Sequence, residues 1–505
     1  MALLPRFCQV LRSWQPCFLD HRTFRRAQEH ALALLVGLGR RTISRSICVL
    51  GRQFRRWAPD YRLFSRCRWQ PQALFDAVLA HLPALLAPTQ PLVVALDDTP
   101  CRKTGKRIRA AKMLRDPLSP PYHLNLCRAL RFLQATLLLW PRARNGAARA
   151  IPVAFDLAPP VAKPQPPRKP RKGASRQEGA AYARAWRRHY QARRSFRQRQ
   201  QAEGLSAQGA RLLNTLRQRC QAVAAWKERI LWAVVDASFC NRTVFRLLDP
   251  RIVLIGRTRK DLRLYRPAPP PRPGRGRQRA YGPLLSTPQE LRQDAAHPWQ
   301  SCAVFAAGQS HTLHYKTLAP VLWRSGAGTR PLRLIVIRPL RYRAHGHTLY
   351  RQPAYLLVSD PALPVPQVLQ AYAYRWEIEV DQKEEKDLLG VGQAQVWSDV
   401  AVARQPAFHV AAYAALLVAA LQTYGLNNPT PAGRLPLWRQ HKPPSRWSTA
   451  HLLAHLRQEI QEYETLSPTT RPHRKRPPFL AEALDAHFGK KFPITTRAIL
   501  THAWT

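Results

Sequence analysis

Acidic residues are scarce in this chain. Its 505 residues include 29 Asp and Glu against 81 Lys and Arg, which gives a formal charge of +52. Like charges at this density repel one another, so a compact fold is hard to keep without a polyanionic partner. Nucleic acid is the first candidate for that partner, and an anionic membrane surface is the second.

Closely spaced cysteines are absent as well. No two of the nine Cys lie closer than nine residues, so the chain has no CxxC pair. This spacing argues against a zinc knuckle, and an odd, scattered set suits a reducing compartment. The cysteines are therefore expected to be small buried hydrophobic residues.

Long hydrophobic runs are also missing. The most apolar stretch, 408–425, contains His409 and is slightly short for a membrane span, so we expect a buried helix there. The N-terminus lacks the basic start, long apolar stretch and cleavage site of a signal peptide. We therefore expect an intracellular protein.

Enough apolar residues remain for true cores. The hydrophobic content is 45%, and the length predicts two to four domains. Residues 1–90 combine short helical patterns with Arg, which fits a helical DNA-binding region or, equally well, a solvated basic surface. Apolar strand patterns occur in 91–260 and 261–360, followed by a helical pattern over 361–395 and a helix-rich region over 396–505. The pattern as a whole predicts an α/β protein.

A basic excursion interrupts the first strand-rich region at about 159–228. Residues 159–175 are rich in Pro, so they must leave the sheet for the surface. Residues 163–199 contain thirteen Lys or Arg and one acid, Glu178. A helix that tracks phosphates is one interpretation, and a solvated helix with aromatic anchors is the other.

The few acids concentrate at three places. An apolar run in "PLVVALDDT" ends at Asp97 and Asp98, and a second, in "ILWAVVDASF", ends at Asp236. The third place is "YAYRWEIEVDQKEEKDLLG", residues 372–390, where six carboxylates fall within eleven residues. At 3.6 residues per turn, Tyr372, Arg375, Glu379 and Lys386 share a helix face only ~60° wide.

This arrangement predicts metal chemistry on phosphodiesters. Carboxylates from separate elements, here Asp98, Asp236 and Glu379, can converge on hard divalent cations, which prefer oxygen ligands. Two such cations can activate water or a 3′-hydroxyl and stabilise the leaving oxygen. Negative charge would then be needed only where metal binds, and the other acids of 377–387 could simply keep the helix soluble.

At these motifs the sequence resembles the DDE transposases of bacterial insertion sequences, in the class with the YREK helix signature. Tyr372, Arg375, Glu379 and Lys386 match that signature at every spacing. The resemblance covers about 90–395 and implies an RNase H-like catalytic core with a β-strand-rich insertion. It further implies that Asp98, Asp236 and Glu379 bind two Mg²⁺ or Mn²⁺ ions. Tyr372, Arg375 and Lys386 would contact the DNA of the element's ends, and the protein would act as a homodimer.

The chain departs from that pattern in two places. Asp97 and Asp98 are adjacent, and neighbouring residues of a strand face opposite sides, so only one can be the inward ligand. Asp98 is chosen because the family's catalytic Asp usually precedes Thr. Ala237 stands where part of the class has Arg after the second Asp. Trp323 is a candidate base-stacking residue, although a core role is the simpler interpretation.

Two other classes of protein remain open. One is a catalytically idle, domesticated DNA-binding protein, against which the three intact carboxylates argue. The other is a structural RNA-binding protein, which would explain the Pro/Arg loops but neither the Asp-ending strands nor the helix face.

Overall fold

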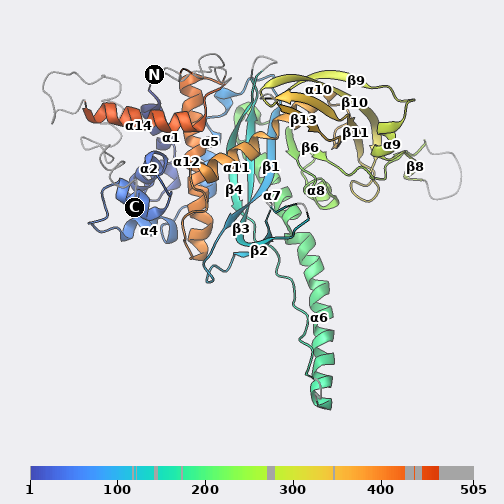
Figure 1. Ribbon diagram of the computed structural model, residues 1–505, viewed down its shortest axis with the longest axis horizontal. Coiled ribbons are helices and arrows are strands. Elements are labelled where there is room, and N and C mark those ends of the chain that lie inside the picture. The colour runs from blue at the N-terminus through green and yellow to red at the C-terminus, as the bar shows by residue number, and fades with distance from the viewer. Residues whose placement is uncertain are drawn as a thin grey trace.

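A large mixed sheet with helices on both faces organises the molecule, which confirms the α/β class (Figure 1). The computed structural model describes residues 2–465 except 117–118, 121, 142–145, 172–174, 270–278, 345–346, 427–436 and 438–445. Two basic stretches lie outside the described residues. They are 471–479 near the C-terminus and 270–278 in the second stretch rich in Pro and Arg.

Five helices precede the sheet: α1 (Leu3–Arg12), α2 (His21–Val36), α3 (Ile43–Val49), α4 (Ala58–Ser65) and α5 (Pro71–Leu79). Side-chain caps fix two of the starts, because Asp20 accepts from the backbone of Thr23 and Thr42 accepts from that of Arg45. These helices are not a separate body. Their apolar residues belong to one hydrophobic cluster that also holds α12 (Asp399–Tyr424) and α14 (Thr449–Thr465).

Five strands form the centre of the sheet: β1 (Leu92–Arg102), β3 (Leu126–Leu139), β4 (Arg149–Leu157), β5 (Leu231–Val235) and β6 (Ile252–Arg257). β4, β3 and β1 pair antiparallel in that order, and β5 and β6 then follow parallel to β1. The short β2 (Lys112–Arg115) pairs with the other end of β3. The parallel strands are continuous apolar runs because both of their faces are buried.

The strand-rich region after β6 continues this sheet. Its elements are β7 (Tyr265–Pro267), β8 (Tyr281–Leu284), α9 (Pro288–Gln293), β9 (Gln300–Ala306), β10 (Gln309–Leu322), β11 (Pro331–Ile337), β12 (Leu340–Ala344), β13 (His347–Arg351) and β14 (Ala354–Val358). β14 pairs antiparallel with β6, and β11, β10 and β9 follow outward, whereas β12 and β13 form a separate hairpin.

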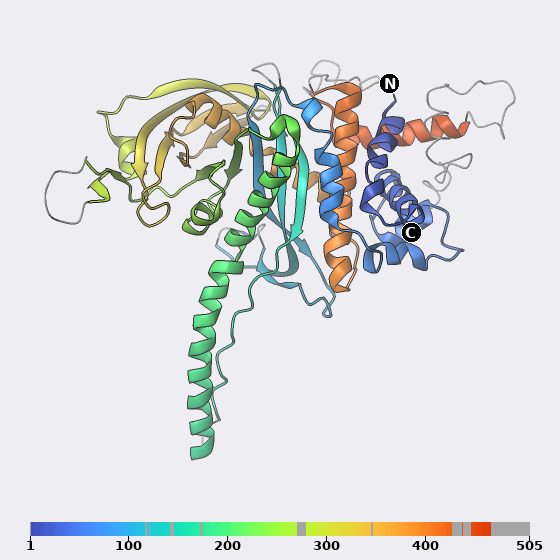
Figure 2. The same ribbon diagram turned by 180° about the vertical axis from the view of Figure 1, so that it is seen from behind.

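The two faces of the sheet are covered by different helices. Leu92, Val94 and Leu96 of β1 pack in the larger cluster, on the face where α7 (Leu205–Ala222) lies. Val93 and Ala95 pack in a smaller cluster with α10 (Val365–Tyr374) and with Ile378 of α11 (Glu377–Asp387). α11 therefore crosses one face of β1 while α7 crosses the opposite face (Figures 1 and 2).

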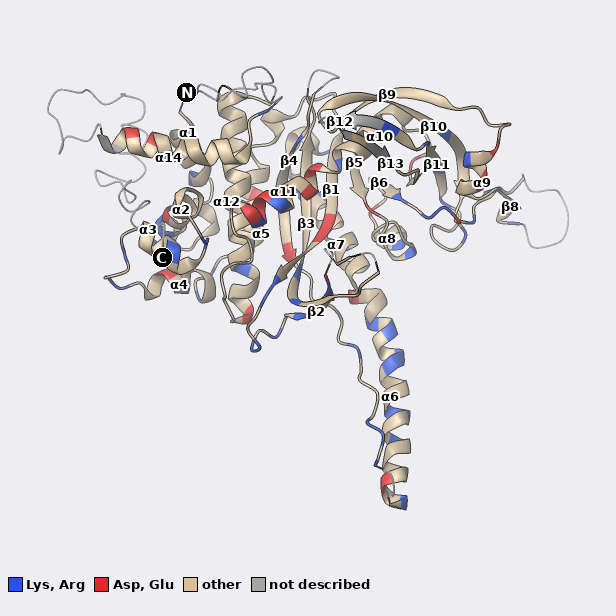
Figure 3. Ribbon diagram, viewed as in Figure 1, with Lys and Arg blue, Asp and Glu red and all other residues tan. Residues whose placement is uncertain are grey.

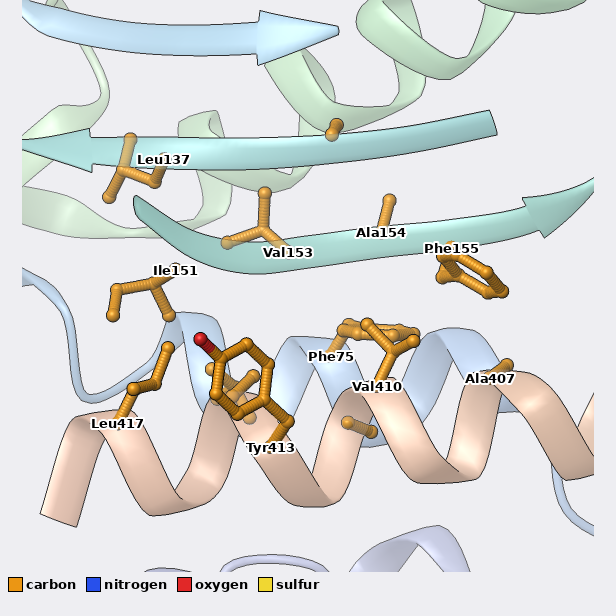
Figure 4. Close-up of a cluster of buried hydrophobic side chains, with 14 of the residues drawn as sticks. Phe75, Leu137, Ile151, Val153, Ala154, Phe155, Ala407, Val410, Tyr413 and Leu417 are labelled. Atoms are coloured by element: carbon orange, nitrogen blue, oxygen red, sulfur yellow. The ribbon is translucent and has the colours of Figure 1, made fainter. Parts of the chain in front are cut away.

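α12 and α5 cover β4 at the end of the sheet. Phe155, Ile151 and Val153 of β4 point at Val410 and Leu417 of α12, and Phe75 of α5 fills the remaining space (Figure 4). α12 is long and apolar enough to cross a membrane by length and composition, yet 83% of its most apolar window is buried inside the protein. The expected buried helix at 408–425 is thus part of the core.

The basic excursion leaves this body altogether. A coil over 159–171 leads out and α6 (Arg176–Glu203) leads back, side by side in both views (Figures 1 and 2). After α6 the chain continues directly into α7. The short helix α8 (Arg242–Leu247) follows β5.

Candidate active site

Asp97 and Asp236 lie side by side where the parallel pairing of β1 with β5 ends. Leu96 of β1 is the register partner of Val235 of β5, and each Asp is the next residue along its strand. The side chains at 93, 95 and 97 share one face of β1, which is the face that α11 crosses. The carboxylate of Asp236 accepts 2.9 Å hydrogen bonds from the backbone and the hydroxyl of Ser238.

Glu379 joins this pair through Arg375. Nη2 of Arg375 donates to Oε1 of Glu379 at 2.8 Å, and Nη1 lies 3.8 Å from Oδ2 of Asp97. One guanidinium thus connects a carboxylate of the sheet with a carboxylate of the helix. Nη1 of Arg375 is buried and makes no hydrogen bond to any described residue.

Asp98 points elsewhere. It shares the strand face of Val94 and Leu96, and its Oδ2 lies 3.3 Å from Nε of Arg131 on β3. Burial raises the pKa of Asp98; the charge of Arg131 opposes that rise, the charge of Asp236 adds to it, and the charge of Lys386 opposes it. The structure therefore brings Asp97, and not the expected Asp98, together with Arg375 and Glu379.

The electrostatics of Asp97 are those of a crowded carboxylate. Burial and then the neighbouring charge of Asp236 raise the pKa of Asp97 to about 7, against the lowering effect of a hydrogen bond from the backbone of Asp98 and of the charge of Arg375. When two carboxylates lie close together and partly out of water, each ionises less readily unless a cation lies beside them. Figure 3 shows red segments on β1 and α11 near the middle of the molecule.

The expected single helix over 361–395 is two helices. α10 ends at Tyr374, and α11 begins at Glu377 after a tight turn in which Ile378 donates to the carbonyl of Arg375. Arg375 and Glu379 keep their i, i+4 contact across this turn. Tyr372 is partly buried against the smaller core cluster, and Lys386 lies in the last turn of α11, where its charge lowers the pKa of Asp98.

Four of the five other acids of α11 are structural, so for these four the interpretation that they only solubilise the helix is wrong, whereas Asp387 is exposed. Asp381 and Glu385 are almost fully buried, and burial raises the pKa of both carboxyls well above its usual range. Glu385 accepts a 2.7 Å hydrogen bond from Gln134, which is the register partner of Asp97 on β3. Glu377 accepts one from Arg446.

Glu384 is the centre of a buried polar cluster behind α11. It accepts hydrogen bonds from the hydroxyls of Tyr413 on α12 and Thr449 on α14. Nη2 of the buried Arg149 on β4 lies 3.5 Å from the same carboxylate and donates to Thr449 at 2.8 Å. This cluster, Arg149, Glu384, Tyr413 and Thr449, ties α11 to three other elements and so fixes how its opposite face meets Asp97.

Two further residues make structural contacts, and for Trp323 this agrees with the core role favoured from the sequence. Lys103 stands after the Asp pair but is buried, and it donates to the carbonyls of Gly392 and Ala394 at 2.8 and 2.6 Å. It therefore anchors the loop that follows α11. Trp323 is partly buried in the core, edge-on to Phe245 with ring centroids 5.6 Å apart.

Metal ligation is the chemistry that this donor set suits. Among the residues that the structure describes, no three His, Cys, Asp or Glu side chains lie close enough together to hold a metal ion as they stand. Asp97 and Asp236 are close enough for the charge of Asp236 to raise the pKa of Asp97, and Arg375 links Asp97 to Glu379. Hard divalent cations prefer such oxygen donors, and they would relieve the repulsion that raises the pKa of Asp97.

Comparison with known families adds an independent observation. The sequence model of a family described as DDE superfamily endonuclease matches residues 15–330. The matched range contains Asp97, Asp98 and Asp236 and ends before α10 and α11. No curated protein is significantly similar to the chain.

Proposed function

Because this chain belongs to the DDE superfamily endonuclease family, we propose that it is a transposase that binds the ends of its own insertion sequence and cuts and joins DNA there. Members of this superfamily generally use divalent metal ions and act on DNA. The observation that carries the proposal is the placement of Asp97 beside Asp236 where the parallel pairing of β1 with β5 ends, with Arg375 linking Asp97 to Glu379.

The strand order supports an RNase H-like core. Three antiparallel strands, β4, β3 and β1, are followed by β5 and β6 parallel to β1, with helices between β4 and β5 and between β5 and β6, and with the Glu-bearing helix after the last strand. In open α/β sheets, ligands bind outside the carboxyl ends of the strands. Asp236 directly follows β5, and Asp97 lies beside it where the parallel pairing of β1 with β5 ends.

Asp97, Asp236 and Glu379 would hold the metal, so Asp97 takes the role that the sequence gave to Asp98. Mg²⁺ or Mn²⁺ ions bound there, two as in related chemistry, would activate the attacking water or 3′-hydroxyl and stabilise the leaving oxygen. Arg375 neutralises Asp97 and Glu379 until then, and its buried Nη1 has a donor to spare for a scissile phosphate. Tyr372 and Lys386, on the same side of α10 and α11, are proposed DNA contacts.

The YREK class, a homodimer on DNA and a bacterial cytoplasmic setting complete the proposal. The spacing of Tyr372, Arg375, Glu379 and Lys386 supports the YREK class, and the charge of +52 supports binding to DNA. The homodimer and the bacterial cytoplasm follow from the resemblance to that class alone. Sequencing the DNA beside the gene for terminal inverted repeats would supply the substrate for the test.

The test uses Glu379→Gln, which keeps the size of the side chain and removes its charge. Single-turnover cleavage of a plasmid with the flanking DNA, in Mg²⁺ or Mn²⁺, should fall at least ~100-fold, the scale of losing one well-placed catalytic group. Binding of the same DNA in EDTA should stay within a few-fold. Equal losses of binding and cleavage would make Glu379 structural, and a wild-type protein that binds without ever cleaving would be an idle DNA-binding protein.

A further inference from the structure

The arm, defined as residues 159–171 and α6, has no role in the candidate active site. It projects from the body of the molecule as a coil and a helix that run side by side (Figures 1 and 2). At 1.5 Å per residue, the 28 residues of α6 extend over ~42 Å. A feature of this length outside the core needs its own physical explanation.

The coil has the spacing of a polyproline helix. Of its residues, 161, 164, 167 and 170 are half-buried, and those between them are exposed. A polyproline II helix has three residues per turn and rises ~3.1 Å per residue, so thirteen residues extend over ~40 Å. The coil therefore matches α6 in length and keeps one edge against it, which explains why this segment is rich in Pro.

α6 has one sheltered stripe. Its half-buried or buried residues recur at helical spacing: Tyr182, Ala185, Trp186, His189, Ala192 and Phe196. Aromatic contacts reinforce the stripe, since the ring centroids of Trp186 and His189 are 5.2 Å apart. In both views the described segment beside α6 is the coil, so the apolar side of the helix is already covered (Figures 1 and 2).

The base of the arm is fixed to the catalytic body. The side-chain amide of Gln208 on α7 donates to the carbonyl of Pro159 at 3.2 Å and to that of Glu203 at 2.7 Å, so one residue holds both ends of the arm. Gly204 lies between α6 and α7. Glycine is needed at this position because a Cβ there would lie 2.3 Å from the carbonyl oxygen of Gln200. The arm is thus a built projection with a defined start.

The exposed side of the arm is strongly basic. The arm has twelve Lys and Arg and two Glu, and Figure 3 shows blue along α6. At ~100° per residue, six Arg of α6 fall within an arc of ~140° opposite the sheltered stripe. They are Arg176, Arg184, Arg187, Arg188, Arg194 and Arg199, and all six are exposed. We call them the arginine face.

We propose that the arginine face grips the sugar–phosphate backbone of duplex DNA outside the segment being cut. Arg176 and Arg199 are ~35 Å apart along the axis of α6, about one turn of B-DNA. Arg is suited to phosphate because its planar fork donates to two oxygens at once. The inference rests on the proposed function only for the identity of the polyanion.

Two other partners fit the arm less well. A second copy of the arm would bring two surfaces of the same strong charge together, which costs free energy. A membrane surface would bind an amphipathic helix through its apolar side, but the coil covers that side of α6.

The experiment compares two pairs of substitutions on the same helix. Arg187→Gln with Arg194→Gln removes two charges from the arginine face. Arg193→Gln with Arg197→Gln removes two exposed charges that lie outside it, so the change in net charge is matched. Gln is nearly as good a helix former as Arg, and circular dichroism checks that α6 is retained.

Binding of a random-sequence duplex of ~40 base pairs, longer than one turn, is measured in EDTA over ~50–400 mM salt. The slope of log K against log salt is negative, and each lost phosphate contact makes it shallower by ~0.9. The arginine-face pair should therefore make the slope shallower by about 2. The matched pair should leave it within ~0.5 of wild type. The proposal would be overturned if both pairs changed the slope equally or if neither changed it. It would also be overturned if the arginine-face pair lost self-association while DNA binding stayed intact.

Metal-dependent cleavage by the same preparations keeps this outcome separate from the proposed function. A wild-type protein that shows the slope difference and never cleaves DNA would support the arm and remove the transposase. A protein that cleaves normally and shows no slope difference would do the reverse.

Discussion

Asp97 is the residue for which the expectation from the sequence and the structure differ most. The apolar run Leu92–Leu96 is buried on both faces, so its pattern does not tell which side α11 covers. That side is set by the docking of Ile378 and α10 on Val93 and Ala95. Spacing did predict that Arg375 and Glu379 share a helix face, because an i, i+4 pair needs only local geometry.

The raised pKa of Asp97 predicts a pH-dependent stability in metal-free protein. Asp97 titrates near 7 in the folded state and near 3.8 otherwise. Its stabilising contribution is therefore fully present below about 4 and is lost as the pH rises through about 7. Asp97→Asn removes this dependence, so the variant should exceed wild type in free energy of unfolding by about 2–4 kcal/mol at pH 8 and by little at pH 4.

Urea unfolding of both proteins in EDTA, from pH 4 to 8, measures this difference. Mg²⁺ at pH 8 should then stabilise wild type and leave Asp97→Asn unchanged. Parallel stability curves for the two proteins would show that Asp97 does not carry a raised pKa.

α11 is the element that the sequence described least completely. Its cluster of acids is visible in the sequence, but the partners of Glu384 come from β4, α12 and α14 and lie 235, 29 and 65 residues away along the chain. Such contacts leave no periodic signal. The turn at Arg375 that divides the helix is equally silent, since Tyr374, Arg375 and Trp376 are ordinary helix residues.

The Glu384 cluster predicts a cost for removing one hydroxyl. Tyr413→Phe leaves a buried carboxylate short of a donor, which should destabilise the protein by about 1–3 kcal/mol. The same change should slow metal-dependent cleavage, because α11 would no longer be held in one orientation over Asp97.

Tyr424→Phe is the matched control, since it makes the same substitution on α12 at a hydroxyl with no hydrogen-bond partner among the described residues. Thermal unfolding should place this control within about 0.5 kcal/mol of wild type. Similar costs at both positions would mean that the Glu384 cluster does not hold α11.

At the scale of the whole molecule, regions that the sequence separates share one core. The larger hydrophobic cluster runs from Leu3 to Tyr463 without a break between the expected domains. The sheet likewise continues through β14 into β11 and β10. The sequence correctly predicted that 301–358 is rich in strands. It did not predict that β14 pairs with β6, because the pattern of a single strand does not contain the register of its pairing.

A fragment of residues 91–395 should therefore not fold as the full chain does. It would expose Phe155, Ile151 and Val153 of β4, which α12 and α5 cover in the full chain (Figure 4). We expect the fragment to bind a hydrophobic dye and to lack a cooperative thermal transition, whereas the full chain shows one. A cooperative transition in the fragment would establish the catalytic region as an independent domain.

The central claim is that Asp97, and not its neighbour Asp98, acts with Asp236 and Glu379. The most direct measurement is metal-dependent nicking of a supercoiled plasmid by wild type, Asp97→Asn and Asp98→Asn, in Mn²⁺ and in EDTA. Asp97→Asn should lose at least ~100-fold in rate, the scale of one essential group, while Asp98→Asn stays within ~10-fold. The reverse ranking would contradict the account, because it would place the reacting DNA on the opposite face of β1.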